Sequence, residues 1–149
     1  MGDFLYYNEL LFLSYRELVH LLIKKYGEVT DDYFSEKSYT RFLNGEIKTI
    51  AKGKFSRALE GLYCHHIFEN KYENIGDLEF IRAYKYPHEL QRKGNLVYCD
   101  LVEHLILHVW GHWNIHTENS GRNTNNIFYM IMKVRILFCS MYNLSQIFF

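Results

Sequence analysis

Apolar residues recur at three- and four-residue steps through residues 6–26, "YYNELLFLSYRELVHLLIKKY". Leu18 and Leu22 share a face in this pattern, which predicts one amphipathic helix over the whole range. Two lysines fall in its last turn, where they suit the negative end of the helix dipole. Gly27 follows at the position where glycine often ends a helix.

Residues 28–60 show no sustained hydrophobic period. "NGE" at 44–46 and "KGK" at 52–54 are turn signals. We therefore expect short strands or a short helix here, separated by turns.

The middle of the chain alternates between strand-like and irregular segments. "GLYCHHI" (61–67) and "NLVYC" (95–99) predict two short strands. The 27 residues between them, 68–94, are too many for a simple hairpin connection. They predict one or two short helices, one over 77–85 and another starting near Pro87, a residue favoured at the first helical position.

"DLVEHLILHVWGHW" (100–113) predicts a helix with a defined start. Asp100 is a good N-cap, and Glu103 three residues later completes a capping box. The order strand, long excursion, strand, helix predicts an α+β fold.

Composition limits the classes of protein to which the chain can belong. Its 149 residues, 48% of them apolar, predict one compact domain with a real core. The apolar N-terminus is interrupted by Asp3 and Glu9 and lacks the features of a signal peptide, and we expect no membrane association. Three scattered cysteines, Cys64, Cys99 and Cys139, argue for a reducing compartment, which predicts a cytoplasmic protein.

Three parts are expected within this domain: a helical and mixed segment over 1–60 with possible DNA contacts, a core over 61–113, and a tail over 114–149. The tail contains the loop-like "NSGRNTNN" and then a long apolar stretch without an acidic residue. It is open whether this stretch covers the core, seeks a partner as in a homodimer, or is a frameshifted end.

The net charge and the local charge of the chain point to different conclusions about nucleic-acid binding. The net charge is zero, but the stretch from Lys37 to Arg57 contains six Lys or Arg and one Glu. This basic stretch is either a solvated surface or a phosphate-contacting face, whose binding would then be sensitive to salt. The candidate nucleic-acid contacts are Lys48, Lys52, Lys54, Arg57 and Arg92.

Two pairs of histidines are candidates for metal binding and for a general base. His104 and His108 lie four residues apart, on one face of the predicted helix, where both can reach one cation. Alone, this spacing favours two histidines on a partly exposed helix face over metal ligation. His65 and His66 sit on a predicted strand, where neighbouring side chains point to opposite faces. One can therefore bind a metal while the other acts as a base with a near-neutral pKa.

"CHHI" (64–67) followed by "NLVYCDLVEHLILH" (95–108) resembles the HNH endonuclease family, and the overall pattern is similar to small phage-borne HNH proteins. The resemblance covers residues 60–110. It implies a ββα-metal fold, here with an N-terminal helix and a long insertion between the strands. It also implies one divalent cation and the hydrolysis of DNA phosphodiester bonds in a bacterial or phage-infected cell.

The same resemblance assigns roles to individual residues. The implied metal ligands are His65, His104 and His108. It implies that His66 is the general base and that Asn95 braces the loop and holds the base in orientation. Mg²⁺ is the usual cation beside a phosphate, whereas three histidines favour Zn²⁺, Mn²⁺ or Ni²⁺. The alternative is a non-catalytic nucleic-acid-binding or structural protein with a zinc-type site.

The chain departs from the family in lacking paired Cys-x-x-Cys motifs and in its long insertion. Basic residues of the insertion either contact DNA or keep it soluble. Cys64 and Cys99 are read as packing residues, with Cys64 on the same strand face as His66. Glu69 either orients a histidine, binds the metal through water or has no role in the site.

Overall fold

A computed structural model describes the backbone of residues 2–117 and the side chains of residues 5–110. The expectations for residues 119–149 lie outside the described residues. Within them the fold is α+β, with a small antiparallel sheet flanked by helices, as predicted. No helix in the described range is long and apolar enough to cross a membrane.

The N-terminal segment forms two helices, so the predicted single helix over 6–26 is wrong. Helix α1 covers Gly2–Leu10 and α2 covers Tyr15–Tyr26. Ser14 starts the second helix, because its hydroxyl accepts from the backbone of Glu17 while the Glu17 carboxylate accepts from the backbone of Ser14. This capping box outweighs the continuous apolar spacing around it. Gly27 ends α2 with a positive φ of 82°, as predicted.

Residues 28–60 contain one α-helix, α3 (Glu36–Leu43), and a 3-10 turn, η1 (Ala58–Glu60). The only strand-like pairing in this segment is an isolated antiparallel bridge between Phe34 and Lys52. Of the two expectations for this segment, the short helix is confirmed, and no strand longer than this bridge forms in it.

Both predicted strands form and pair with each other. Strand β1 (Tyr63–His66) runs antiparallel to β2 (Leu96–Cys99), with His65 opposite Val97. Between them lie the 3-10 turn η2 (Ile67–Asn70), helix α4 (Leu78–Tyr84), and two further 3-10 turns, η3 (His88–Gln91) and η4 (Lys93–Asn95). Helix α4 lies within the predicted range 77–85, and the structure shows that the Asp77 carboxylate caps it by accepting from the backbone of Glu79.

One prediction for the segment between the strands is wrong, and the prediction for the start of the last helix is confirmed. Pro87 precedes the short turn η3 and does not start an α-helix as expected. Helix α5 (Leu101–Thr117) follows β2 directly. Its Asp100 carboxylate accepts from the backbone of Val102 and Glu103, and Glu103 accepts from the backbone of Asp100, which confirms the predicted capping box.

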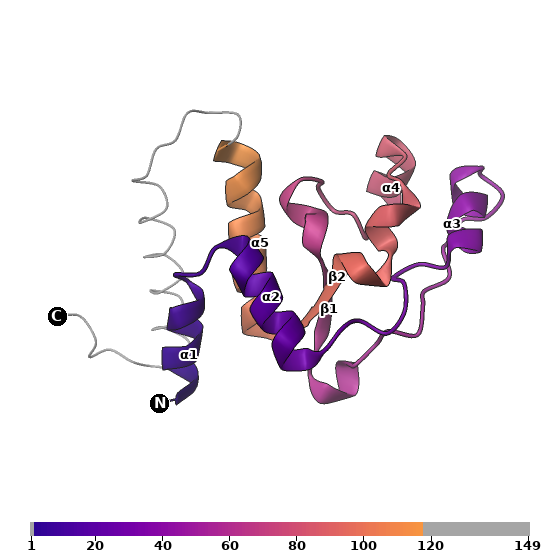
Figure 1. Ribbon diagram of the computed structural model, residues 1–149. Helices are drawn as coiled ribbons and strands as arrows, with labels where there is room; N and C mark the ends of the chain where they lie inside the picture. The colour runs from indigo at the N-terminus through magenta and orange to yellow at the C-terminus, as the bar shows by residue number, and fades with distance from the viewer. Residues whose placement is uncertain (1, 118–149) are drawn as a thin grey trace.

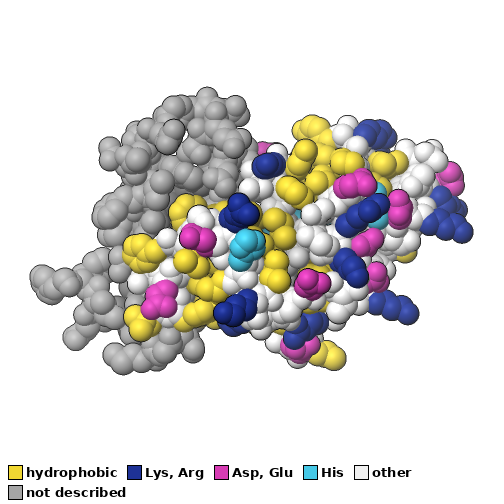
Figure 2. Space-filling model, viewed as in Figure 1, with side chains coloured by type: hydrophobic (Ala, Val, Ile, Leu, Met, Phe, Trp, Pro, Cys, Tyr) yellow, Lys and Arg dark blue, Asp and Glu magenta, His cyan; other side chains and the backbone are white. Residues whose placement is uncertain are grey.

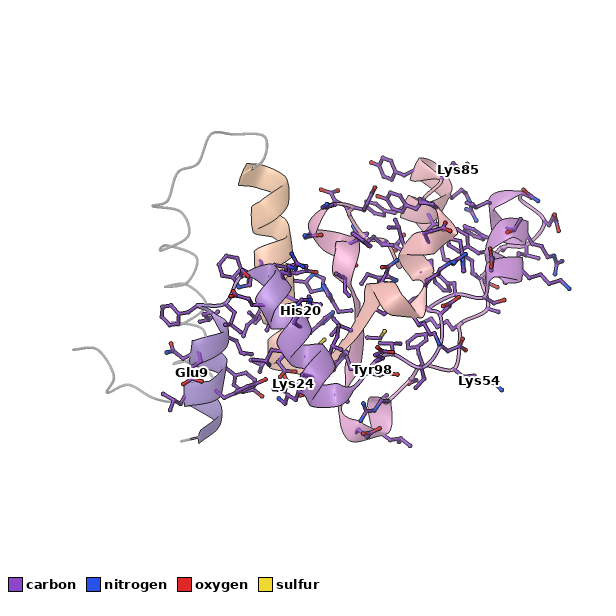
Figure 3. All side chains as sticks on the ribbon, in the orientation of Figure 1. Glu9, His20, Lys24, Lys54, Lys85 and Tyr98 are labelled. Carbon is purple, nitrogen blue, oxygen red and sulfur yellow. The ribbon has the colours of Figure 1, made fainter. Side chains whose placement is uncertain are left out.

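The two strands, β1 and β2, lie between two groups of helices. Figure 1 shows α1, α2 and α5 gathered on one side of the strands and α3 and α4 on the other. Val97 and Cys99 face the first group, in a core with leucines of α1 and α2. Tyr98 faces the opposite way, packs beside Phe55 and lies near the centre of the molecule in Figure 3.

A buried carboxylate joins the three helices on the first side. Glu103 of α5 is 0% exposed. Its Oε1 accepts from Lys25 Nζ of α2 at 2.7 Å and from the Tyr6 hydroxyl of α1 at 2.6 Å. This network fixes the first turn of α5, the turn that also carries His104.

Candidate metal centre

Three histidines from two elements lie close together. His65 comes from β1, and His104 and His108 come from successive turns of α5. One ring nitrogen from each lies within 4.8 Å of the others. His65 is buried and the other two are half-buried. Such a group can hold a metal ion, and it is the set that the sequence pattern singled out.

The spacing between the ligand atoms fits a small tetrahedral ion. His104 Nε2 and His108 Nε2 are 3.2 Å apart. A zinc ion about 2.1 Å from each of two nitrogens holds them about 3.4 Å apart in tetrahedral geometry. The Nε2 atoms of the two helix histidines hydrogen-bond to each other here, at a spacing close to the one that a single tetrahedral cation requires. Imidazole nitrogen is a ligand that suits Zn²⁺ and its neighbours.

Burial keeps the imidazoles of His65 and His104 uncharged, as metal ligands must be. Desolvation, together with the neighbouring His108 and His104, holds the pKa of His65 well below its usual value. Desolvation and the neighbouring His108 also lower the pKa of His104 to about 4. Both rings are then neutral at pH 7 and present a lone pair rather than a competing proton.

Glu69 lies beside the same group. Its Oε2 is 3.4 Å from His65 Nδ1 and 3.8 Å from His108 Nε2. Burial raises the pKa of this carboxyl to about 7. Glu69 stands four residues after His65, in η2, so the turn at the end of β1 brings it back toward the ring that precedes it. The sequence left open whether Glu69 has a role in the site, and the structure places its carboxylate beside two of the three histidines.

His66 points to the opposite face of β1, as the strand alternation predicted. It is 4% exposed and its ring packs 4.5 Å from that of Tyr33. Burial lowers its pKa to about 4, opposed by a hydrogen bond to Gln91. The near-neutral pKa expected for a general base is therefore absent from this environment. Cys64 lies on this face too, packed with Tyr98 and Phe55, as predicted.

Gln91, from η3, fixes the orientation of His66. The Gln91 amide nitrogen donates to the Ile75 carbonyl at 2.9 Å, so its oxygen faces His66 Nε2 at 3.0 Å. An amide oxygen only accepts, so Nε2 carries the hydrogen and Nδ1 keeps the lone pair. Asn95, expected to hold the base, instead donates to the Glu89 carbonyl at 2.6 Å. It braces the turn η3, and Gln91 makes the direct contact.

Replacing Gln91 with methionine is expected to destabilise the protein by roughly 2 kcal/mol, because two buried polar groups lose their partners at similar side-chain volume. Those groups are the His66 ring N–H and the Ile75 carbonyl. Urea denaturation followed by circular dichroism measures the change. Asn44→Met is the control, because the Asn44 amide bonds only to Glu46 at the surface. Equal stability of the two variants would contradict the role of Gln91.

The sequence interpretation missed Tyr15 and Gln91. Tyr15 Oη lies 3.2 Å from His65 Nε2. In the sequence Tyr15 opens an apolar stripe that continues with Leu18 and Leu22, so it looked like a core residue, and it is buried. Gln91 lies in an irregular basic segment. Neither residue has a spacing relative to His65 or His66 that would have revealed its contact.

The basic candidates for nucleic-acid contact differ in how exposed they are. Lys48, Lys52 and Lys54 are exposed, and Figure 3 shows Lys54 at the periphery of the molecule. Arg57 bonds to Glu60 and to the Tyr26 carbonyl and lies over the Tyr98 ring. Arg92 lies 3.4 Å from Glu89. In the face shown in Figure 2, basic and acidic side chains are interspersed and do not form a continuous basic patch.

Comparison of this chain with protein-family models, with curated proteins and with solved structures finds no match. The HNH resemblance therefore stays a prediction from the motif, and the functional argument depends on the site itself.

Proposed function

We propose that this protein is a metal-dependent endonuclease of the HNH type, with a ββα-metal core formed by β1, β2 and α5. The single observation that carries the proposal is the convergence of His65, His104 and His108 from the first strand and the helix. The order of these residues in the motif and the closeness of their ring nitrogens both support the proposal. The proposed substrate is DNA.

Each part of the site has a role in this proposal. His65, His104 and His108 hold one divalent cation, which when bound polarises a phosphate and stabilises the leaving oxygen. The three histidines leave a coordination position open to substrate, as catalytic zinc sites do. His66 presents its Nδ1 lone pair as the proton acceptor, held in that tautomer by Gln91. Exposed lysines of the 48–54 segment contact the phosphate backbone.

The catalytic role of His66 requires a movement. Its ring is buried between Gln91 and Tyr33, on the face of β1 away from the metal ligands. A water molecule must reach Nδ1 before the ring can accept a proton from it. Binding of substrate would therefore have to open the packing around Tyr33.

A second candidate is a structural metal site in a non-catalytic nucleic-acid-binding protein. The burial of His66 favours it, and so does the position of Glu69 Oε2 near two of the ligand nitrogens. Three histidines and a carboxylate would close the coordination sphere, as in structural zinc sites. In that case a chelator unfolds the protein, because the metal-binding free energy is part of the folding free energy.

Nicking of supercoiled plasmid by the full chain tests the nuclease proposal, with Mg²⁺, Mn²⁺ or Zn²⁺ added to chelator-treated protein. We expect the wild type to cut and His66→Ala to cut at least about 100-fold more slowly, the lower range for loss of a general base. His20→Ala is the control, because His20 lies exposed on α2, outside the site.

The outcomes separate three statements. Absence of cutting by the wild type with every metal overturns the nuclease proposal. Equal rates for wild type and His66→Ala overturn the role of His66 while leaving the activity. RNA offered in the same assay shows whether the substrate class is DNA.

A further inference from the structure

We propose that Tyr15 is a positioning residue of the metal centre: its hydroxyl holds His65 as the Nε2–H tautomer, so that His65 binds the cation through Nδ1. The inference depends on the proposed metal centre and holds for either a catalytic or a structural ion. Tyr15 belongs to α2, outside the segment that resembles the HNH motif.

The hydrogen bonds of Tyr15 fix where the protons are. Its hydroxyl donates to the Ile67 carbonyl at 2.8 Å. A hydroxyl has one hydrogen, and a carbonyl can only accept, so that hydrogen is committed. Toward His65 Nε2, at 3.2 Å, the Tyr15 oxygen can then only accept. His65 Nε2 must therefore carry a hydrogen.

The second nitrogen of His65 is consequently the ligand atom. A neutral imidazole with a hydrogen on Nε2 has its lone pair on Nδ1. His65 Nδ1 is buried and makes no hydrogen bond with any described residue. It lies 3.4 Å from Glu69 Oε2, on the side of the ring where His108 Nε2 also approaches that carboxylate. A buried acceptor without a partner is costly, and a cation bound there would satisfy it.

The backbone geometry makes Tyr15 suited to this task. Ile67 directly follows the histidine pair at the start of η2. One hydroxyl therefore contacts both the ring of His65 and the main chain two residues later. Because Tyr15 lies in the first turn of α2, which Ser14 caps, the orientation of His65 depends on an N-terminal helix.

Tyr15→Phe tests the inference, because it removes only the hydroxyl. We expect the affinity for Zn²⁺ to fall about 10- to 100-fold, the usual effect of losing a hydrogen-bond partner of a ligating histidine. Isothermal titration of the chelator-treated full chain with ZnCl₂ measures it. Tyr39→Phe is the matched control: the Tyr39 hydroxyl is also buried and donates to a carbonyl, that of Tyr86, outside the centre.

The Zn²⁺ titration has three distinguishable outcomes. Failure of the wild type to bind Zn²⁺ overturns the metal centre and with it the proposed function. Binding by the wild type with equal affinities for Tyr15→Phe and Tyr39→Phe overturns the role of Tyr15 alone. An affinity loss in Tyr15→Phe that exceeds the loss in Tyr39→Phe supports it.

A measurement on the wild type keeps the inference testable if Tyr15→Phe does not fold. In protein labelled with ¹⁵N-histidine and loaded with ¹¹³Cd²⁺, NMR coupling identifies the nitrogen bound to the metal. We expect coupling to Nδ1 of His65 and to Nε2 of His104 and His108. Coupling to Nε2 of His65 would overturn the assignment, because Tyr15 occupies that side of the ring.

Discussion

His104→Ala is expected to lower the affinity of the protein for Zn²⁺ by more than about 100-fold, beyond the effect of losing an outer hydrogen-bond partner. His104 supplies one of the three imidazoles that the described residues bring together, and its Nε2 lies 3.2 Å from His108 Nε2. Without it, two imidazoles of this group remain. Isothermal titration of chelator-treated protein with ZnCl₂ measures the change.

The control for this experiment is another histidine. His20 is exposed and belongs to α2, where Figure 3 labels it, so His20→Ala should bind Zn²⁺ as the wild type does. His104 is only half-buried, so its removal should leave the fold intact, which circular dichroism checks. Unchanged Zn²⁺ binding by folded His104→Ala would show that the three histidines do not form the binding site.

Lys25→Met is expected to destabilise the protein by about 2–3 kcal/mol, because it leaves the buried carboxylate of Glu103 without the Lys25 ammonium group that pairs with it. Breaking a fully buried pair costs about 3–5 kcal/mol. Glu103 is fully buried, but the Lys25 side chain keeps 37% of its exposure, so solvent offsets part of the loss. The Tyr6 hydroxyl still donates to the carboxylate and reduces the cost further. Urea denaturation measures the free energy of unfolding.

The matched control is a surface ion pair. Arg41 and Glu46 lie 3.1 Å apart with about half of each side chain exposed, so Arg41→Met should change stability little. Equal destabilisation by Lys25→Met and Arg41→Met would show that the Lys25–Glu103 pair contributes no more to the free energy of unfolding than a surface pair does.

Because Glu103 and His104 share a helical turn, Lys25→Met should also weaken Zn²⁺ binding.

The sequence predicts the second half of the fold better than the first. The capping box at Asp100 and Glu103 uses residues within one turn, so it can be read from local order, and the structure contains it. An equivalent box at Ser14 and Glu17 was present in the sequence and was overlooked, because a continuous apolar period runs through it. The break between α1 and α2 was therefore predictable in principle.

The sequence also predicts only part of the candidate site. Helix geometry paired His104 with His108, and the resemblance to the HNH motif implied that His65 is the third ligand; the structure brings these three side chains together. The partners Tyr15 and Gln91 lie far from their histidines in sequence, in elements whose packing no local pattern records. The burial of His66 is likewise a tertiary effect, because it arises from the packing of Tyr33 and Gln91 over one face of the strand.

The pairing of β1 with β2 across residues 67–95 has a consequence for how the protein folds. Closing so long a loop costs chain entropy before any strand contact forms, whereas the backbone hydrogen bonds of α4 inside the loop are local. The two strands are therefore expected to pair late in folding. His65 and His108 lie on opposite sides of this loop in the sequence, so the three histidines cannot come together before the sheet closes. During synthesis, α5 must therefore leave the ribosome before the candidate metal centre can form.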